Sequence, residues 1–144
     1  MKITRRIFDE IVATVGAEEP ETGGALGSKN GVVCRFYFDE AATRDKGKYT
    51  PDTDSINEKI AAWQDEDISF AGLVHSHPNG CNQLSFEDEA SIKAIFDASE
   101  LISRLYFPII TVMDNKITMT VYKAKHKRRR LLIRKAKYRI VSEK

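Results

Sequence analysis

Apolar residues recur along this chain with two periods, one typical of helices and the other typical of strands. Helical spacing predicts three helices, with approximate bounds 3–15, 56–63 and 85–98. In the first of them the apolar stripe runs from Ile3 to Val15, and Gly16 follows it as a helix stop. The middle helix ends its stripe at Trp63, and the last helix begins at Ser85.

Short runs of β-branched and aromatic residues predict the strands. Five strands are expected, at residues 21–27, 32–38, 68–74, 106–112 and 117–122. Asn30-Gly31 and Asp114-Asn115 have the composition of two-residue hairpin turns. Pro108 has no backbone N–H to donate, so we expect its strand to lie at a sheet edge or to carry a bulge near its start.

The order of these elements predicts a mixed α/β fold in which helices pack on one mixed sheet. A length of 144 residues argues for one domain over residues 1–144, and a chain of this length buries an adequate core without disulfides or metals as staples. Residues 39–51 are polar and lack periodicity, which predicts a long loop of the kind that often carries function.

Composition places the chain among ordinary soluble globular proteins. It is 42% apolar and 31% charged, and no stretch approaches the roughly 18 uninterrupted apolar residues of a membrane span. The first residues lack the apolar core of a signal peptide, so we expect a cytoplasmic location. Two cysteines, Cys34 and Cys81, do not form a disulfide framework in such a chain, and Cys34 lies in an apolar strand.

Charge is distributed unevenly along the chain. Residues 1–115 carry 11 basic and 20 acidic side chains, whereas residues 116–144 carry 12 basic and one acidic. The basic C-terminal segment 123–144 suggests an alternative function, a binding module for nucleic acid or for an acidic protein. It lacks regularly spaced aromatic residues, so we do not expect nucleic-acid binding as the main function. Alternation around Ile140 predicts a last strand with one buried face, so we expect the cations of this segment to line one surface of the fold.

Candidate chemistry is concentrated where the strand at 68–74 ends. His75 and His77 are two residues apart, so at a strand end both imidazoles point the same way, as two ligands of one metal must. Ser85-x-x-Asp88 opens the following helix and taken alone is a capping box, with Ser85 as N-cap. The cap is compatible with Asp88 as a third ligand, and a catalytic zinc site has three protein ligands and an open fourth position.

The run His75-Ser76-His77, seven residues, Ser85, two residues and Asp88 resembles the JAMM motif of the MPN+ (Mov34/JAB) zinc metallopeptidases of prokaryotic type. That family also has an upstream glutamate before a glycine run, which Glu21 before Thr22-Gly23-Gly24 matches. The resemblance covers the chain from about residue 19 to residue 121, and every position of the motif is filled. It implies an MPN fold, which is a cytidine-deaminase-like sheet.

The resemblance also implies a role for each motif residue. One Zn²⁺ per chain would be held by His75, His77 and Asp88, with a water of lowered pKa in the fourth position. Glu21 would be the general base, a choice that spacing alone does not make among the neighbouring glutamates. Ser85 would donate a hydrogen bond to the developing oxyanion.

Family members with a complete motif hydrolyse peptide or isopeptide bonds at the C-terminus of a ubiquitin-like protein or its conjugate. The compact size and the Glu-Thr-Gly-Gly run resemble members encoded beside ubiquitin-transfer-like enzymes in antiphage operons, so such enzymes are expected partners. Other members of the family trim sulfur-carrier proteins or cleave at cysteine, and the sequence does not choose among these roles. A zinc deaminase is set aside because the chain has no Cys-x-x-Cys pair. Cys81 is a candidate fourth ligand or nucleophile, but we favour a spectator because a catalytic zinc needs an open position.

Overall fold

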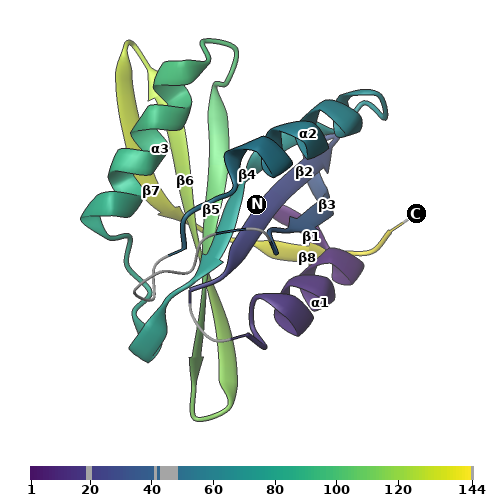
Figure 1. The fold of residues 1–144 in the computed structure, drawn as a ribbon, viewed down its shortest axis with the longest axis vertical. Coiled ribbons are helices and arrows are strands. Elements are labelled where there is room, and N and C mark those ends of the chain that lie inside the picture. Colours follow the sequence, from purple (N-terminus) through teal and green to yellow (C-terminus); the bar gives the residue numbers. More distant parts are fainter. Residues whose placement is uncertain (19–20, 41, 43–48, 144) are drawn as a thin grey trace.

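The computed structural model describes every residue except 19–20, 41, 43–48 and 144. The described chain folds into one eight-stranded sheet with three α-helices on it (Figure 1). The strands, in chain order, are β1 (Lys2–Thr4), β2 (Gly23–Lys29), β3 (Val32–Phe38), β4 (Ser69–Ser76), β5 (Arg104–Met113), β6 (Lys116–Lys127), β7 (Arg130–Ala136) and β8 (Arg139–Val141). Their order across the sheet is β7-β6-β5-β4-β2-β3-β1-β8.

The helices divide between the two faces of the sheet. Helix α1 (Arg5–Thr14) packs on β1, β3 and β8, and its apolar side shares a core with Val74. Helices α2 (Thr53–Gln64) and α3 (Phe86–Ala98) share contacts with Leu73 on the opposite face. The predicted mixed α/β plan with one sheet is confirmed.

A bulge in β4 sets which way the residues at its end point. The pairing of β4 with β2 shifts at Ala71, where β4 carries one extra residue, and Gly72 beside it has a φ of 142°. Because of the extra residue, Phe70 and Leu73 lie on the same face, toward α2 and α3. His75, two residues beyond Leu73, therefore faces α3 as well.

Gly72 is the position where this bulge depends on glycine. A Cβ added there would overlap the Tyr106 carbonyl oxygen of β5, and φ lies where L side chains are strained. We expect Gly72→Ala to lower the free energy of unfolding by about 3 kcal/mol, or about 10 °C in Tm. The matched control is Gly31→Ala, which also has a positive φ (77°) but open space around its Cβ, and which should cost only about 1 kcal/mol. Equal Tm values for the two variants would contradict this account.

The first helix begins later than the sequence predicts. Ile3 continues the helical spacing but lies in β1, which is parallel to both β3 and β8 and buries Ile3 completely. Helix α1 then starts after Thr4, whose side chain accepts a hydrogen bond from the Ile7 N–H at 3.3 Å. Burial between two neighbouring strands outweighs the helical pattern at this position.

The expectation for Pro108 is wrong. Its strand, β5, lies inside the sheet between β4 and β6, and Pro108 pairs with Val121 of β6 within an unbroken register. The pairs between β5 and β4 are Gly72 with Tyr106 and then His75 with Ile109, and Pro108 falls between them. The missing N–H is therefore accommodated at a gap in the pairing with β4.

The basic C-terminal segment belongs to the sheet. Strand β6 continues to Lys127, well beyond the predicted 117–122, and β7, which the sequence analysis did not predict, forms a hairpin with it. The predicted strand at Ile140 is confirmed as β8, parallel to β1. Most of the predicted loop 39–51 lies outside the described residues. Among the described helices, none has the length and apolar character to cross a membrane.

Candidate metal centre

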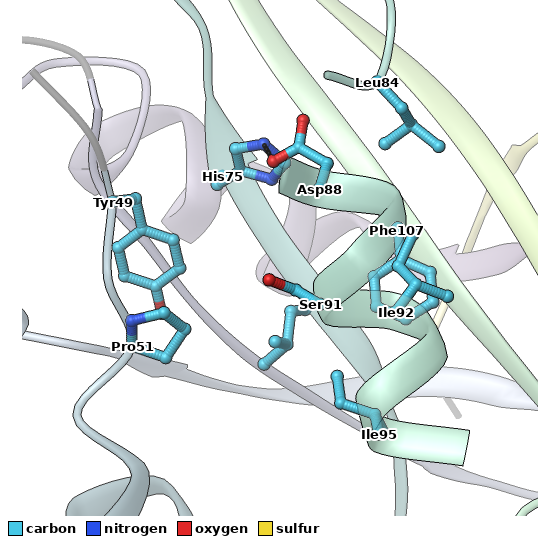
Figure 2. A pocket seen from close by; sticks show the side chains of 10 residues that line it. Tyr49, Pro51, His75, Leu84, Asp88, Ser91, Ile92, Ile95 and Phe107 are labelled. Carbon is cyan, nitrogen blue, oxygen red and sulfur yellow. Dashed lines mark ion pairs between the residues drawn. The ribbon is translucent and has the colours of Figure 1, made fainter. Parts of the chain in front are cut away.

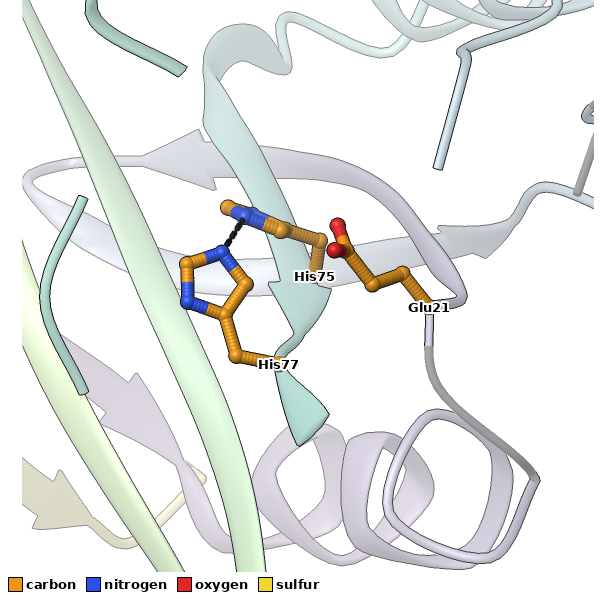
Figure 3. A group of neighbouring side chains, drawn as sticks. All are labelled: Glu21, His75 and His77. Atoms are coloured by element: carbon orange, nitrogen blue, oxygen red, sulfur yellow. Dashed lines mark hydrogen bonds between the residues drawn. The ribbon is translucent and has the colours of Figure 1, made fainter. Parts of the chain in front are cut away.

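Two buried histidines form the centre of the site. His75 lies near the end of β4 and His77 directly follows that strand, and the two residues are 8% and 6% exposed. Their Nε2 atoms are 2.8 Å apart, so both imidazoles point to one spot, as the alternate spacing predicts (Figure 3).

Asp88 reaches this spot from the start of α3. The Ser85 hydroxyl accepts the Asp88 N–H at 3.0 Å, and the Ser85 N–H donates to Asp88 Oδ2 at 2.8 Å. This capping box, predicted from the sequence, fixes the carboxylate. Its Oδ1 is 3.3 Å from His75 Nε2 and its Oδ2 is 3.0 Å from His77 Nε2, and Figure 2 shows Asp88 directed at His75.

Glu21 is held beside the histidines by the main chain that follows it. The Thr22 N–H donates to Ser76 Oγ at 3.1 Å, and the Ser76 N–H donates to the Thr22 carbonyl at 2.9 Å. Ser76 thus joins the end of β4 to the main chain at Thr22. The ligand atoms of Glu21, His75 and His77 lie within 4.8 Å of one another, so these three can hold a metal ion (Figure 3).

The donor set fits a divalent metal. Four ligand atoms placed tetrahedrally at zinc distances of about 2.0–2.1 Å are about 3.3–3.4 Å apart. The nitrogen–oxygen distances of 3.0 and 3.3 Å from the histidines to Asp88 are close to that separation, and the two Nε2 atoms, 2.8 Å apart, would have to move apart by about 0.5 Å on binding the metal. His77 Nδ1 lies 3.1 Å from the Cys81 carbonyl, and a hydrogen bond donated there leaves the Nε2 lone pair free for a metal. The Cys81 side chain itself is exposed, and its Sγ contacts the Gln83 carbonyl at 3.9 Å.

The pKa values of His77 and Asp88 reflect how close these two side chains lie to each other. Burial alone would lower the pKa of His77, but hydrogen bonding and charge from Asp88 outweigh it and raise the pKa to about 9. Burial would raise the pKa of Asp88, but the two histidines and the Ser85 N–H hold that pKa well below its usual range. A proton and a metal ion therefore compete for the Nε2 lone pair of His77.

The aromatic ring of Tyr49, which the sequence did not single out, flanks the site. The Tyr49 ring stacks on His75 with centroids 6.3 Å apart, and its hydroxyl donates to Asp39 at 2.9 Å. Burial, followed by the Asp39 charge, raises the pKa of Tyr49 well above its usual range. Gly23 makes room for this stack, because a Cβ there would lie 2.7 Å from the Tyr49 ring and 3.0 Å from His75 Cβ. These contacts join distant segments and leave no local sequence pattern.

A pocket opens between Tyr49 and α3, as Figure 2 shows. His75 and Asp88 lie at its polar end, and most of the rest is apolar. The lining residues are Tyr49, Pro51, Leu73, His75, Leu84, Asp88, Ser91, Ile92, Ile95 and Phe107. The pocket therefore presents a mostly apolar surface directly beside the candidate metal centre.

Comparison with solved structures defines the class of fold. The solution structure of protein DSY2949 from Desulfitobacterium hafniense is similar over 99% of this chain and 93% of that one, with 19% identity and a TM-score of 0.72. The crystal structure of AF2198, a JAB1/MPN domain protein from Archaeoglobus fulgidus, covers 85% of this chain and 88% of its own, with 20% identity and a TM-score of 0.52. The predicted MPN fold is confirmed.

The family profile described as prokaryotic homologs of the JAB domain matches residues 4–128. The chain therefore belongs to the prokaryotic JAB-domain family, which confirms the resemblance seen in the sequence. A comparison with curated proteins gave no match.

Proposed function

We propose that this chain is a zinc-dependent peptidase that hydrolyses peptide or isopeptide bonds at the C-terminus of a ubiquitin-like protein or its conjugate. The observation that carries the proposal is the convergence of His75, His77 and Asp88 within 3.3 Å, with Glu21 beside them. The substrate class comes from the family resemblance of the motif. We place the activity in the cytoplasm, with ubiquitin-transfer-like enzymes as partners.

Each residue has a distinct task in this proposal. His75, His77 and Asp88 hold the zinc, and the cap at Ser85 and the carbonyl of Cys81 orient two of these ligands. Bound there, zinc supplies a Lewis acid for the scissile carbonyl and makes water reactive near neutral pH.

Glu21 transfers protons. It lies among the ring nitrogens of the site but, within the described chain, makes no hydrogen bond to either histidine. Its carboxylate is therefore available to take a proton from the attacking water and to give one to the leaving amine. A lysine amine of an isopeptide bond or a main-chain amine serves equally as the leaving group.

Ser85 has a second task besides the cap. Its oxygen accepts the Asp88 N–H, and within the described part of the chain no group accepts the Ser85 hydroxyl hydrogen. That hydrogen is free to stabilise negative charge on the scissile carbonyl oxygen.

Replacing Ser85 separates these two tasks. We expect Ser85→Ala to cost about 1 kcal/mol of stability through the lost cap. Turnover should fall by about 10²–10³-fold through the lost donor. Ser85→Thr, which keeps both the cap and a hydroxyl, is the control for thermal unfolding and for kcat. If the fall in kcat of Ser85→Ala is no larger than the loss of folded protein accounts for, Ser85 takes no part in the chemistry.

The peptidase activity can be tested before its substrate has been identified. Zinc-loaded protein and its Glu21→Gln variant are incubated separately with a lysate of the source cells, and new protein termini are quantified by mass spectrometry. We expect termini to appear only with the parent protein, at the C-terminal ends of ubiquitin-like domains. Identical termini with both proteins, or cleavage elsewhere, would refute the proposal.

A further inference from the structure

Several cations of the C-terminal segment lie on one face of the sheet, as the sequence led us to expect of the whole segment, whereas Lys135, which pairs with Tyr122, faces the other side. Lys123 lies opposite Tyr106 of β5 and opposite Arg134 of β7, so side chains in register with it share its face. Six of these are basic, and we call them the basic face: Arg104, Lys123, Lys125, Lys127, Arg130 and Arg134. All but Lys123 are exposed.

Nothing in the described chain neutralises the basic face. Strands β5, β6 and β7 contain no acidic residue. Helix α1 packs on the same side of the sheet but against β1, β3 and β8, and α2 and α3 cover the opposite side. Within the described residues, no ion pair involves any of the six cations. The face therefore presents a concentrated positive potential to solvent.

The turn that joins β6 to β7 adds two more cations at a conformational cost. Arg128 and Arg129 have φ angles of 51° and 65°, a region that arginine rarely occupies. Among the described residues, the other two hairpin turns with positive φ at both positions are Asn30-Gly31 and Asp114-Asn115, which suit that backbone. The arginines at this tip are therefore not explained by folding, and a departure from local preference of this kind is expected at functional sites.

We propose that the basic face and the Arg128-Arg129 turn bind the phosphate backbone of double-stranded nucleic acid. Protein–protein interfaces have an apolar, aromatic core and are poor in lysine, whereas protein–DNA interfaces are strongly positive. In the three rows of paired residues from Lys127 to Lys123, the side chains on this face are basic apart from Leu132 and Tyr106, and Val121 and Ala136 begin the apolar part of the face beyond them. With so few aromatic rings the surface cannot stack unpaired bases, which favours a duplex bound without sequence preference.

This surface is separate from the candidate metal centre. His75 pairs with Ile109 on β5, whereas the tip of the β6–β7 hairpin lies beyond the start of that strand, where the His126 N–H donates to the Ser103 carbonyl. At about 3.3 Å per residue the two are roughly 20 Å apart along the sheet. In Figure 1 this tip and the β5–β6 hairpin lie at opposite ends of the molecule. A bound duplex would therefore leave the metal centre accessible.

The test exploits the strained turn. Arg128→Asn combined with Arg129→Gly gives the turn its preferred residues, so the double variant should fold with a higher Tm than the parent. If the arginines contact phosphates, the same variant loses duplex affinity although it is more stable. The control with equal charge change is Lys59→Gln with Lys93→Gln, exposed positions on α2 and α3.

Binding of the full-length, zinc-loaded protein to a fluorescent 30-base-pair DNA duplex is followed by anisotropy over a range of salt concentrations. For about five phosphate contacts, log K should fall against log salt with a slope of about −4 to −5. The turn variant should bind roughly 10–100-fold more weakly, with a slope smaller by about 2, and the control should bind like the parent. Equal affinity of the turn variant and the parent would overturn the proposal. Displacement of the duplex by polyglutamate as effectively as by unlabelled duplex, at equal charge concentration, would also overturn it and assign the face to an acidic protein.

Discussion

Glu21→Gln is expected to lower turnover by about 10²–10⁴-fold while the protein keeps its zinc and its fold. Glutamine has nearly the shape of glutamate but cannot accept a proton from the attacking water. Glu21 is held by the hydrogen bonds between Thr22 and Ser76, which the substitution does not touch. The loss should therefore appear in kcat, with little change in Tm.

Glu18→Gln is the matched control, because Glu18 is an exposed carboxylate only three residues away. It should retain parental activity on the substrate that terminus mapping identifies. Zinc content and kcat are measured for both variants. Activity of Glu21→Gln within threefold of the parent would exclude proton transfer by Glu21. Loss of zinc together with activity would instead make Glu21 a metal ligand, a role that its position within 4.8 Å of the two histidines also permits.

The candidate site was largely predictable because its parts are local in sequence. His75 and His77 share one strand end, and Asp88 belongs to a capping box whose spacing is fixed by one helical turn. A spacing of two residues at a strand end and of three residues at a helix start each fix the direction of the side chains, so the sequence predicts where these side chains point. Bringing Glu21 to them requires that β2 and β4 be neighbours, which the pairing of Gly23 with His75 shows.

What the sequence did not predict depends on contacts between distant segments. The extra residue at Ala71 is visible only in the register of β4 against β2. The stack of Tyr49 on His75 joins a loop to a strand. Ile3 fits a helical stripe and a buried strand equally well, and the presence of β3 and β8 on either side of β1 decides between them. The sequence predicted that the basic segment lines a surface but not which of its cations share a side, because that depends on the register of β5, β6 and β7.

His77→Ala is expected to abolish stoichiometric zinc binding. The parent should purify with about one zinc per chain, in keeping with a single catalytic site. His77 supplies an Nε2 directed at the site, and the alanine variant leaves His75 and Asp88 without the third ligand. Metal content after dialysis against trace zinc, measured by mass spectrometry, provides the readout.

His126→Ala is the matched control, because it removes the chain's remaining histidine, which packs on Phe96 with ring centroids 4.9 Å apart and lies outside the site. That variant should retain one zinc.

Zinc uptake by the metal-free parent should also release a proton below about pH 9, since Asp88 raises the pKa of His77 to about 9 and a metal ligand must be neutral imidazole. Zinc affinity should accordingly increase from pH 6 to pH 9 and then level off. Calorimetry in buffers of different ionisation enthalpy measures the proton release. Equal zinc in the parent and His77→Ala would show that the metal, if bound, does not depend on this histidine.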